Sequence, residues 1–414
     1  MMSDWPFQPA LQISAIRLFQ TEIPFQLSFN HATQQRAAVT GIVLQLTSAC
    51  GRHGFGEVLP RPYVSGETDA SVLAALGEVV LPALAGRCFA SVGAVRHYLG
   101  NFYQQHLALA PTASCVRTAV DLALLDLAGQ CLQQPLARLL ADGPVHALSE
   151  TGITAPLQAE VLQYSGTYGL GDAALQRRYQ QAYQALDLQA FKLKVGVNLD
   201  AELALLRTLQ QAHLQASWRV DANGAWSLTQ ARAAIPQLLA LGVQSIEQPL
   251  AASDKAGYLA LFAEFGDAVP LMLDESFCRW SDLDYLLNAG FQPALNLRVS
   301  KCGGILSTLA LATQARQHGL LYQLGAQVGE TVILTRAGQL VAAMLGDCRY
   351  HEGAFGDYLL SHDLQQPSLR FGAQGVLTTE ALQSEPGLAL HIDPAVLNDC
   401  SRHCDSWFVG GIHG

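Results

Sequence analysis

The chain has 414 residues, of which 50% are hydrophobic and 14% are charged, so it can bury a large core and is not a disordered protein. Its formal net charge of −10 argues against nucleic acid as a main partner, because phosphate binding requires a basic surface. No apolar run reaches the length of a membrane span, and the start "MMSDWPFQPA" lacks the features of a secretory signal, which predicts a soluble, cytoplasmic protein without membrane partners.

Residues 1–145 are predicted to form an amino-terminal α+β domain. Strand patterns occur at residues 11–23 and 40–58, and the second contains a glycine-bearing turn. Helical patterns follow at residues 69–84, 92–106 and 112–140. Apolar residues recur at three-and-four spacing throughout the last of these, so we expect that helix to be packed on both sides. The sequence "ADGPVHA" ends the helix and marks a domain boundary.

Between residues 146 and 355, short apolar strand patterns alternate with helical ones. The strand candidates are "FKLKV", "WRVD", "VQSIEQ", "LMLDE", "ALNLRV" and "LLYQLG". Strand–helix alternation predicts a parallel sheet with helices outside it. Seven or eight such units in roughly 200 residues suit a closed barrel better than an open sheet, so we predict an α/β barrel.

The last segment, residues 356–414, does not continue the alternation. It contains two strand-like pieces, "QGVLTT" and "GLALHID", which a closed barrel cannot accept, so we expect them to return to the amino-terminal domain. Nine cysteines are scattered through the chain, which is typical of reduced thiols in a cytosolic protein. The one close group, Cys400, His403 and Cys404, lacks a second half with metal-ligand spacing and is interpreted as a surface turn or a helix end.

Charged residues recur at regular intervals along the predicted barrel strands. Successive strands end at or just before Lys194, Asp221, Glu247, Asp274 and Lys301, which are separated in turn by 27, 26, 27 and 27 residues. The carboxyl ends of barrel strands form the mouth where active sites are built, so these five side chains should meet. A single acid after a strand often caps the next helix, but Glu247 is a poor helix cap, and three acids in phase are not explained by capping.

These residue types indicate a metal site with bases beside it. Three carboxylates at short range raise one another's pKa unless a cation is present, and oxygen-only ligands suit a hard ion, so we predict one Mg²⁺, for which Mn²⁺ can substitute. Lys192 shares a strand face with Lys194, and Lys301 lies on the other side of the acids. Two amines on opposite sides of a bound carboxylate form an acid/base pair, which predicts abstraction of the proton α to a carboxylate through an enediolate.

In these motifs the chain resembles the enolase superfamily, in particular the muconate-lactonizing (muconate cycloisomerase) subgroup of the mandelate racemase/muconate lactonizing enzyme family. The matching elements, in the family's order, are "KLK", "DAN", "EQP", "DES" and the lysine of "SKCGG". The resemblance covers nearly the whole chain and implies a modified (β/α)7β TIM-like barrel with an α+β capping domain, which residues 356–414 would complete. The absence of a K-x-H motif and of a His-Asp dyad on the later strands separates the chain from the mandelate racemase subgroup.

The resemblance also implies a role for each matching residue. It implies Mg²⁺ ligands at Asp221, Glu247 and Asp274, opposed acid/base catalysts at Lys194 and Lys301, charge neutralisation by Lys192, and orienting contacts from Asn223 and Glu275. The expected substrate is a small carboxylate, and family members commonly form homo-oligomers.

Substrate contacts are predicted in two loops of the cap and after the last strands. The candidates are His31 in "HATQQR", Arg61 and Tyr63 in "LPRPYVSGE", and Gln327, Glu330 and Glu352. For "LPRPYVSGE", a proline-stabilised surface loop is the alternative interpretation. No D-x-D motif occurs near residue 350 to hold a substrate ammonium, and the spacing of Glu352 and Asp357 does not replace it, which argues against dipeptide epimerisation. The stretch "GAQVGET" also differs from the usual cycloisomerase sequence, which argues against muconate itself.

Several reactions remain open on such a site. We expect an isomerase, either a racemase or epimerase or a cycloisomerase, and a dehydratase resembling o-succinylbenzoate synthase is the alternative. A Schiff-base aldolase would use one lysine as a nucleophile and would not need three acids in phase. A non-catalytic ligand-binding scaffold would have no use for five intact positions, and it would be indicated by unchanged behaviour on loss of Asp274.

Overall fold

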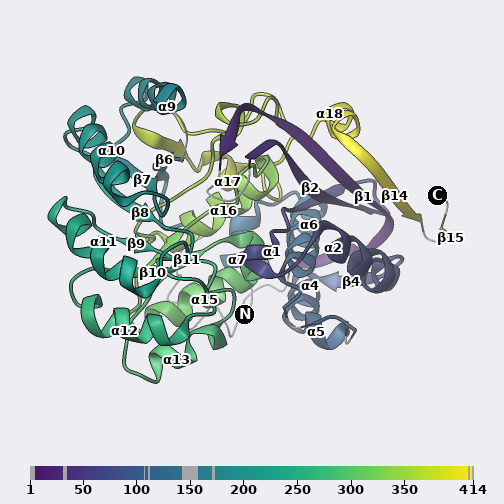
Figure 1. Cartoon of the computed structure of the whole chain (residues 1–414). Coiled ribbons are helices and arrows are strands. Elements are labelled where there is room, and N and C mark those ends of the chain that lie inside the picture. The colour runs from purple at the N-terminus through teal and green to yellow at the C-terminus, as the bar shows by residue number, and fades with distance from the viewer. Residues whose placement is uncertain are drawn as a thin grey trace.

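The computed structural model describes residues 5–30, 35–106, 108–110, 112–141, 157–169, 173–408 and 411–412. Figure 1 shows a barrel wrapped by helices on one side and, beside it, a layer of long strands and helices that carries both the start and the end of the chain. Among the described residues, no helix combines the length and apolar character that crossing a membrane requires. The expected boundary between residues 145 and 146 lies outside the described residues.

The cap is an antiparallel sheet covered by helices. Its strands run in the order β15-β14-β1-β2-β3, with β4 also paired to β1. The strand bounds are β1 (Pro6–Asn30), β2 (Gln35–Ser48), β3 (His53–Val58), β4 (Cys88–Ser91), β14 (Ser401–Phe408) and β15 (Gly411–Ile412). The helices are α1 (Pro62–Ser65), α2 (Asp69–Ala75), the π-helical turn η1 (Leu76–Val80), α3 (Leu81–Leu84), α4 (Val92–Gly100), α5 (Phe102–Gln105), α6 (Ser114–Leu132) and α7 (Leu136–Ala141).

Helix α6 is buried on nearly all sides, as its apolar spacing predicts. It lies against β3 so closely that side chains larger than glycine are excluded from two positions of that strand, Gly54 and Gly56. A Cβ on Gly56 would come within 2.0 Å of the carbonyl oxygen of Ala119, and one on Gly54 would come within 2.4 Å of that of Ala123. The "HGFG" sequence therefore sets the distance between the sheet and the helix.

The second body is a barrel of parallel strands in the order β6 to β12. Its strands are β6 (Gly166–Tyr168), β7 (Ala190–Lys194), β8 (Ser217–Asp221), β9 (Ile246–Glu247), β10 (Leu271–Leu273), β11 (Ala294–Leu297) and β12 (Tyr322–Leu324). Between and after them lie α9 (Ala173–Ala185), α10 (Leu199–Ala212), α11 (Leu228–Ala240), α12 (Lys255–Phe265), η2 (Trp280–Leu283), α13 (Asp284–Leu287), α14 (Val299–Cys302), α15 (Ile305–Gln317) and α16 (Val332–Leu345).

His351 closes this sheet into a ring. It forms parallel bridges with Leu324 in β12 and with Tyr164 beside β6. The N–H of Ser165 donates to the carbonyl of His351 at 3.0 Å, and the N–H of Glu352 donates to that of Leu324 at 2.9 Å. The predicted fold, a modified (β/α)7β TIM-like barrel with an α+β cap, is confirmed.

Buried carboxylates of the cap hold the amino termini of two barrel helices. Glu57 in β3 accepts the N–H groups of Thr331 and Leu334 at the start of α16, both at 3.0 Å. Asp121 in α6 accepts the N–H of Ile305, the first residue of α15, at 2.7 Å. Because the first N–H groups of a helix have no partner within the helix, these contacts join the cap to the barrel.

The carboxyl-terminal segment differs from its predicted form. β13 (Val376–Thr378), the "QGVLTT" piece, pairs with β5 (Val161–Gln163) instead of the cap sheet, and residues 387–393 belong to no strand. The strand that joins the cap sheet is β14, which pairs with β1. It follows α18 (Pro394–Asp399), so a helix end is right for Cys400, whereas Cys404 lies within the strand. The remaining elements are η3 (Gly356–Tyr358), η4 (Ala373–Gly375) and α17 (Glu380–Ser384).

Candidate active site

The five charged residues that recur along the chain lie at one end of the barrel. Lys194, Asp221 and Glu247 are the last residues of β7, β8 and β9, and they are neighbours in the strand register. Asp274 directly follows β10, and Lys301 lies in α14, the short helix after β11. All five are buried, and Lys301 is 0% exposed. The structure therefore brings together the whole set that the 27-residue spacing predicts.

Three of these residues form a compact acidic group. Asp221, Glu247 and Asp274 each offer a carboxylate oxygen, and these oxygens all lie within 4.8 Å of one another. The donors are oxygens only, from side chains on three adjacent strands. This donor set fits a hard divalent cation such as Mg²⁺ or Mn²⁺, and it would also leave positions for substrate oxygens.

Each lysine pairs with a different member of the acidic group. Lys194 Nζ lies 2.5 Å from Asp221 Oδ2, and Lys301 Nζ lies 2.8 Å from Asp274 Oδ1. Lys192 Nζ lies 3.2 Å from Glu247 Oε2. Because β7 and α14 stand on either side of the strands that carry the acids, Lys194 and Lys301 approach the group from opposite sides.

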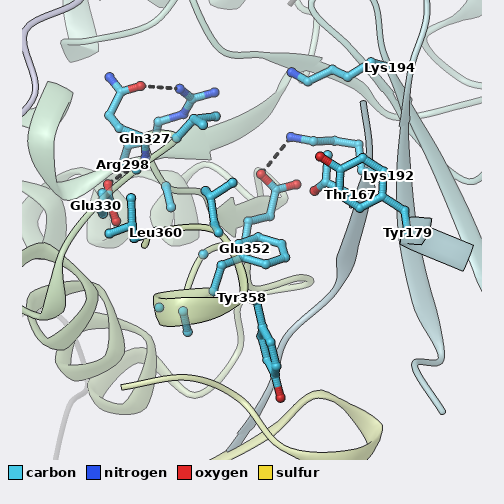
Figure 2. A pocket seen from close by; sticks show the side chains of 18 of the residues that line it. Thr167, Tyr179, Lys192, Lys194, Arg298, Gln327, Glu330, Glu352, Tyr358 and Leu360 are labelled. Carbon is cyan, nitrogen blue, oxygen red and sulfur yellow. Dashed lines mark hydrogen bonds and ion pairs between the residues drawn. The ribbon is translucent and has the colours of Figure 1, made fainter. Parts of the chain in front are cut away.

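Glu352, on the closing segment of the barrel, belongs to the same network. Its Oε2 lies 2.7 Å from Lys192 Nζ, and its Oε1 lies 2.7 Å from Arg219 Nη2. Figure 2 shows the pairing of Glu352 with Lys192 beside the cavity. Arg219 precedes Asp221 by two residues in β8, so the two side chains share the inner face of the barrel.

The sequence analysis missed several polar residues that contact the site. Arg298 donates to Asp274 and, at 2.9 Å, to Gln327 Oε1. Asn296 and Gln323 donate to the two oxygens of Glu247 at 2.7 and 3.1 Å. The sequence feature that could have identified them is a polar side chain within an otherwise apolar strand, as in "ALNLRV" and "YQL".

Side-chain cations keep most of these acids ionised. Burial acts to raise the pKa of Asp221, but Lys194 and Lys192 outweigh it, so the pKa lies below its ordinary value. Burial is likewise outweighed at Asp274 by Arg298 and Lys301, and its pKa is also lowered. Glu247 differs, because burial together with the nearby carboxylates exceeds the effect of Lys192 and raises its pKa to about 8.

For the lysines, burial acts to lower the pKa and nearby carboxylates act to raise it. Burial alone would lower the pKa of Lys192, but Glu247, Glu352 and Asp221 raise it above its ordinary value. At Lys301 the same opposition, with Asp274 as the main carboxylate, also raises the pKa. Both side chains are therefore held as ammonium ions by the acids they face.

Asn223 and Glu275 lie next to this group. Asn223 Oδ1 accepts from Lys194 Nζ at 2.9 Å, and its Nδ2 donates to Glu275 Oε1 at 3.1 Å. Asn223 has φ of 45°, a left-handed conformation that asparagine tolerates better than most residues. Burial, with Asp274 and Asp221 nearby, raises the pKa of Glu275 to about 7.

A cavity of about 180 Å³ opens beside Lys192 and Lys194. Lys192, Lys194, Asn223, Glu275 and Arg298 line its inner end. Figure 2 shows Gln327, Glu330 and Glu352 around the same space.

The expected substrate contacts divide into three cases. Tyr63 from α1 lines the cavity and is 50% exposed, and Gln327, Glu330 and Glu352 also line it. Arg61 is buried outside this lining and donates to the carbonyl of Pro60 at 2.8 Å. His31 lies outside the described residues.

Both the cap and the barrel match families of known proteins. Residues 13–141 match the amino-terminal domain of mandelate racemase / muconate lactonizing enzyme, and residues 174–396 match the enolase carboxyl-terminal domain-like family. The L-Ala-D/L-Glu epimerase of Escherichia coli is 31% identical over 328 residues, which are 79% of this chain and 89% of that protein.

Two further proteins are similar over most of the chain. The N-succinyl-L-Arg/Lys racemase of Bacillus cereus is 26% identical over 334 residues, or 80% of this chain and 84% of that protein. A muconate lactonizing enzyme of Pseudomonas fluorescens, solved with muconolactone, superposes with a TM-score of 0.80 at 25% identity and covers 94% of this chain and 99% of that one. The chain therefore belongs to the mandelate racemase / muconate lactonizing enzyme family of the enolase superfamily.

Proposed function

We propose that the protein is a Mg²⁺-dependent isomerase that removes the proton α to a substrate carboxylate, as a racemase or epimerase. The observation that carries this proposal is the placement of Lys194 and Lys301 on opposite sides of the three-acid group. Two bases on opposite sides can remove the α-proton from one face and deliver a proton to the other, which inverts the α-carbon. Relatives named as racemases and epimerases support the same class.

Asp221, Glu247 and Asp274 would hold the cation. A divalent ion bound there supplies Lewis-acid polarisation of the substrate carboxylate. Lys192, which already spans Glu247 and Glu352, is placed to offset the negative charge that develops as the α-proton leaves. Asn223 accepts from Lys194 and orients its amine toward the cavity.

With a cation held by Asp221, Glu247 and Asp274, these carboxylates would no longer be free to keep Lys194 and Lys301 as ammonium ions. The neutral amine of one lysine would then take the α-proton, and the substrate carboxylate would become an enediolate. The opposite lysine, as an ammonium, then donates a proton to the other face of the α-carbon. Cycloisomerisation would also pass through an enediolate, formed when a second carboxylate of the substrate adds to a conjugated double bond and closes a ring, and a lysine ammonium would then protonate the α-carbon. The likeness to muconate lactonizing enzyme keeps that reaction as the second candidate.

The test is α-proton exchange in D₂O with N-acetyl-L-alanine and related carboxylates, followed by NMR. We expect incorporation of deuterium that stops with EDTA and returns with Mg²⁺. Exchange that is indifferent to EDTA would contradict the metal assignment.

Single variants separate racemisation from the alternatives. Lys194→Ala and Lys301→Ala should each abolish inversion, while each keeps exchange with one enantiomer only. Full inversion by either variant would contradict the two-base mechanism. A homo-oligomeric state and a cytoplasmic location remain predictions of the sequence.

A further inference from the structure

The cavity does not end beside the lysines of β7 but continues sideways out of the barrel mouth. One wall of this extension is α9, which presents Tyr179, Ala182 and Tyr183 at helical spacing, with Leu186 just beyond its end. The other wall is formed by residues 353–360, which follow the closing segment of the barrel. We call this extension the side groove.

The side groove is largely apolar and aromatic. Phe355, Tyr358, Leu359 and Leu360 line it opposite α9. Tyr358 donates its hydroxyl to the carbonyl of Phe371 at 3.2 Å, so this ring offers an apolar surface with its polar group already satisfied. Figure 2 shows the ring of Tyr358 below Glu352 and that of Tyr179 on the opposite side of the cavity.

No carboxylate is among the described lining residues of the two walls of the side groove, whereas elsewhere in the cavity Glu275 and Glu330 have neutral hydrogen-bond partners and Glu275 Oε2 has none. Glu352 is paired with Lys192 and Arg219, and Glu275 accepts from Asn223. Glu330 accepts the N–H of Gln327 at 2.6 Å. Asp357 lies outside the lining and is paired with Arg370 at 2.7 Å.

The charged side chain at the outer part of the groove is a cation, Arg178. A substrate ammonium placed in the groove would therefore meet apolar rings and a like charge, and it would lose hydration without a counter-ion. An apolar group would instead bury its surface against the rings.

In the α9 wall of the groove, one side chain has a polar atom with no protein partner. The hydroxyl of Tyr179 is buried and makes no hydrogen bond. Figure 2 shows the hydroxyls of Tyr179 and Thr167 on the side of the cavity where Lys192 lies. A neutral hydrogen-bonding group of the substrate, next to the carbon that carries the carboxylate, would satisfy this hydroxyl.

We infer that the side groove binds an uncharged, apolar distal group of the substrate, joined to the α-carbon through a neutral linkage such as an amide that contacts the Tyr179 hydroxyl. This inference rests on the proposed function, because the lysines fix where the carboxylate end lies. The protein would accordingly favour N-acylated amino acids with apolar acyl groups and would reject dipeptides with a free ammonium.

Four probes that share the alanine carboxylate and α-proton test this inference. They are N-acetyl-L-alanine, N-(3-phenylpropanoyl)-L-alanine, L-phenylalanyl-L-alanine and N-succinyl-L-alanine. The second and third differ only by an ammonium group. With Mg²⁺ present, we expect kcat/KM for α-deuterium exchange to be about 10-fold or more higher for the phenylpropanoyl compound than for the acetyl and dipeptide compounds.

Equal values for the four probes, or a preference for the dipeptide, would overturn the inference. A preference for the succinyl probe would also overturn it and would indicate an ion pair with Arg178. Calorimetric binding of the same probes separates the two proposals. If no probe exchanges but the phenylpropanoyl compound binds most tightly, the proposed function fails and the groove assignment stands.

Variants of α9 locate the effect. Ala182→Trp should fill the side groove and bring the ratio of kcat/KM between the phenylpropanoyl and acetyl probes toward one. Ala185→Trp, at an exposed alanine of the same helix outside the cavity lining, should keep the wild-type ratio. Tyr179→Phe should lower kcat/KM several-fold for both probes and leave their ratio unchanged. An Ala182→Trp ratio equal to that of wild type would contradict the groove assignment.

Discussion

Two sets of buried acids in this protein are neutralised in different ways. At the barrel mouth, Asp221 and Asp274 face lysine and arginine side chains, and their pKa values are lowered despite burial. Between cap and barrel, burial raises the pKa of Glu57 and of Asp121 to about 7, because the N–H groups and Thr331 hydroxyl at Glu57, and the Arg117 charge and N–H groups at Asp121, offset it only in part. Similar carboxyl groups in one chain thus have pKa values below their ordinary value at one place and above it at another.

The difference shows what peptide dipoles can and cannot do. The N–H groups at a helix start satisfy the hydrogen bonds of a buried carboxylate, but here they do not offset the loss of hydration. Full positive charges at 2.5 to 2.8 Å do offset it at Asp221 and Asp274, whereas Lys192 at 3.2 Å from Glu247 does not. A site that must present ionised oxygens to a cation therefore needs lysine and arginine nearby, whereas a contact that only joins two domains does not.

The largest effect is expected from Asp274→Asn, which disrupts the group of buried acids and cations at the barrel mouth. It removes a metal ligand and leaves Lys301 and Arg298 without their carboxylate. We expect α-exchange to fall about a thousandfold or more, and the free energy of unfolding to fall by about 3–5 kcal/mol, as for other broken buried pairs. NMR exchange and urea unfolding measure the two quantities.

A matched control is Asp284→Asn, at an exposed acid in the same part of the barrel. It should leave both quantities unchanged. Wild-type exchange in Asp274→Asn would show that the mouth acids do not serve a cation.

The second-largest effect is expected from Glu57→Gln, which should change how the free energy of unfolding depends on pH. The pKa of Glu57 is raised from its ordinary 4.5 to about 7, so its contribution to stability is complete below pH 4.5 and is lost as the pH rises through 7. We expect the advantage of wild type over Glu57→Gln in unfolding free energy to shrink by on the order of 2–3 kcal/mol between pH 4.5 and pH 8. Urea titrations across this range measure it, and a constant difference would mean that Glu57 titrates normally in the folded protein.

The smallest effect is expected on the surface. Arg232 and Glu264 form an ion pair in which the side chains are 44% and 38% exposed. Water screens such a pair, so Glu264→Gln should leave the melting temperature unchanged within error. A clear drop in melting temperature would show that this exposed ion pair stabilises the protein despite its contact with water.

The barrel and the core of its site could be predicted from the sequence because their signals recur. Each of five strands ends near one charged residue, and the spacing repeats almost without change. Arg298 and Asn296 could not be found in this way, because they break an apolar strand without a repeat to support them. The side groove was also out of reach, since its walls are far apart in the chain and Tyr179 lies on a helix with mostly polar residues.

The tail shows a different limit. In strand β14 the consecutive residues Arg402 and His403 point to opposite faces and are both exposed, so the alternation of apolar and polar residues typical of a strand is absent. Its partner strand, β1, supplies most of the buried apolar residues in this part of the sheet. Such a strand is specified by its partner more than by its own sequence.

The pairing of β1 with β14 also sets an order of events during synthesis. β1 leaves the ribosome long before β14, yet Phe19 pairs with Cys404. Until β14 has been synthesised, one edge of β1 has unpaired backbone groups beside a strongly apolar face. The nascent protein must therefore keep this edge of β1 unpaired while its entire barrel is synthesised.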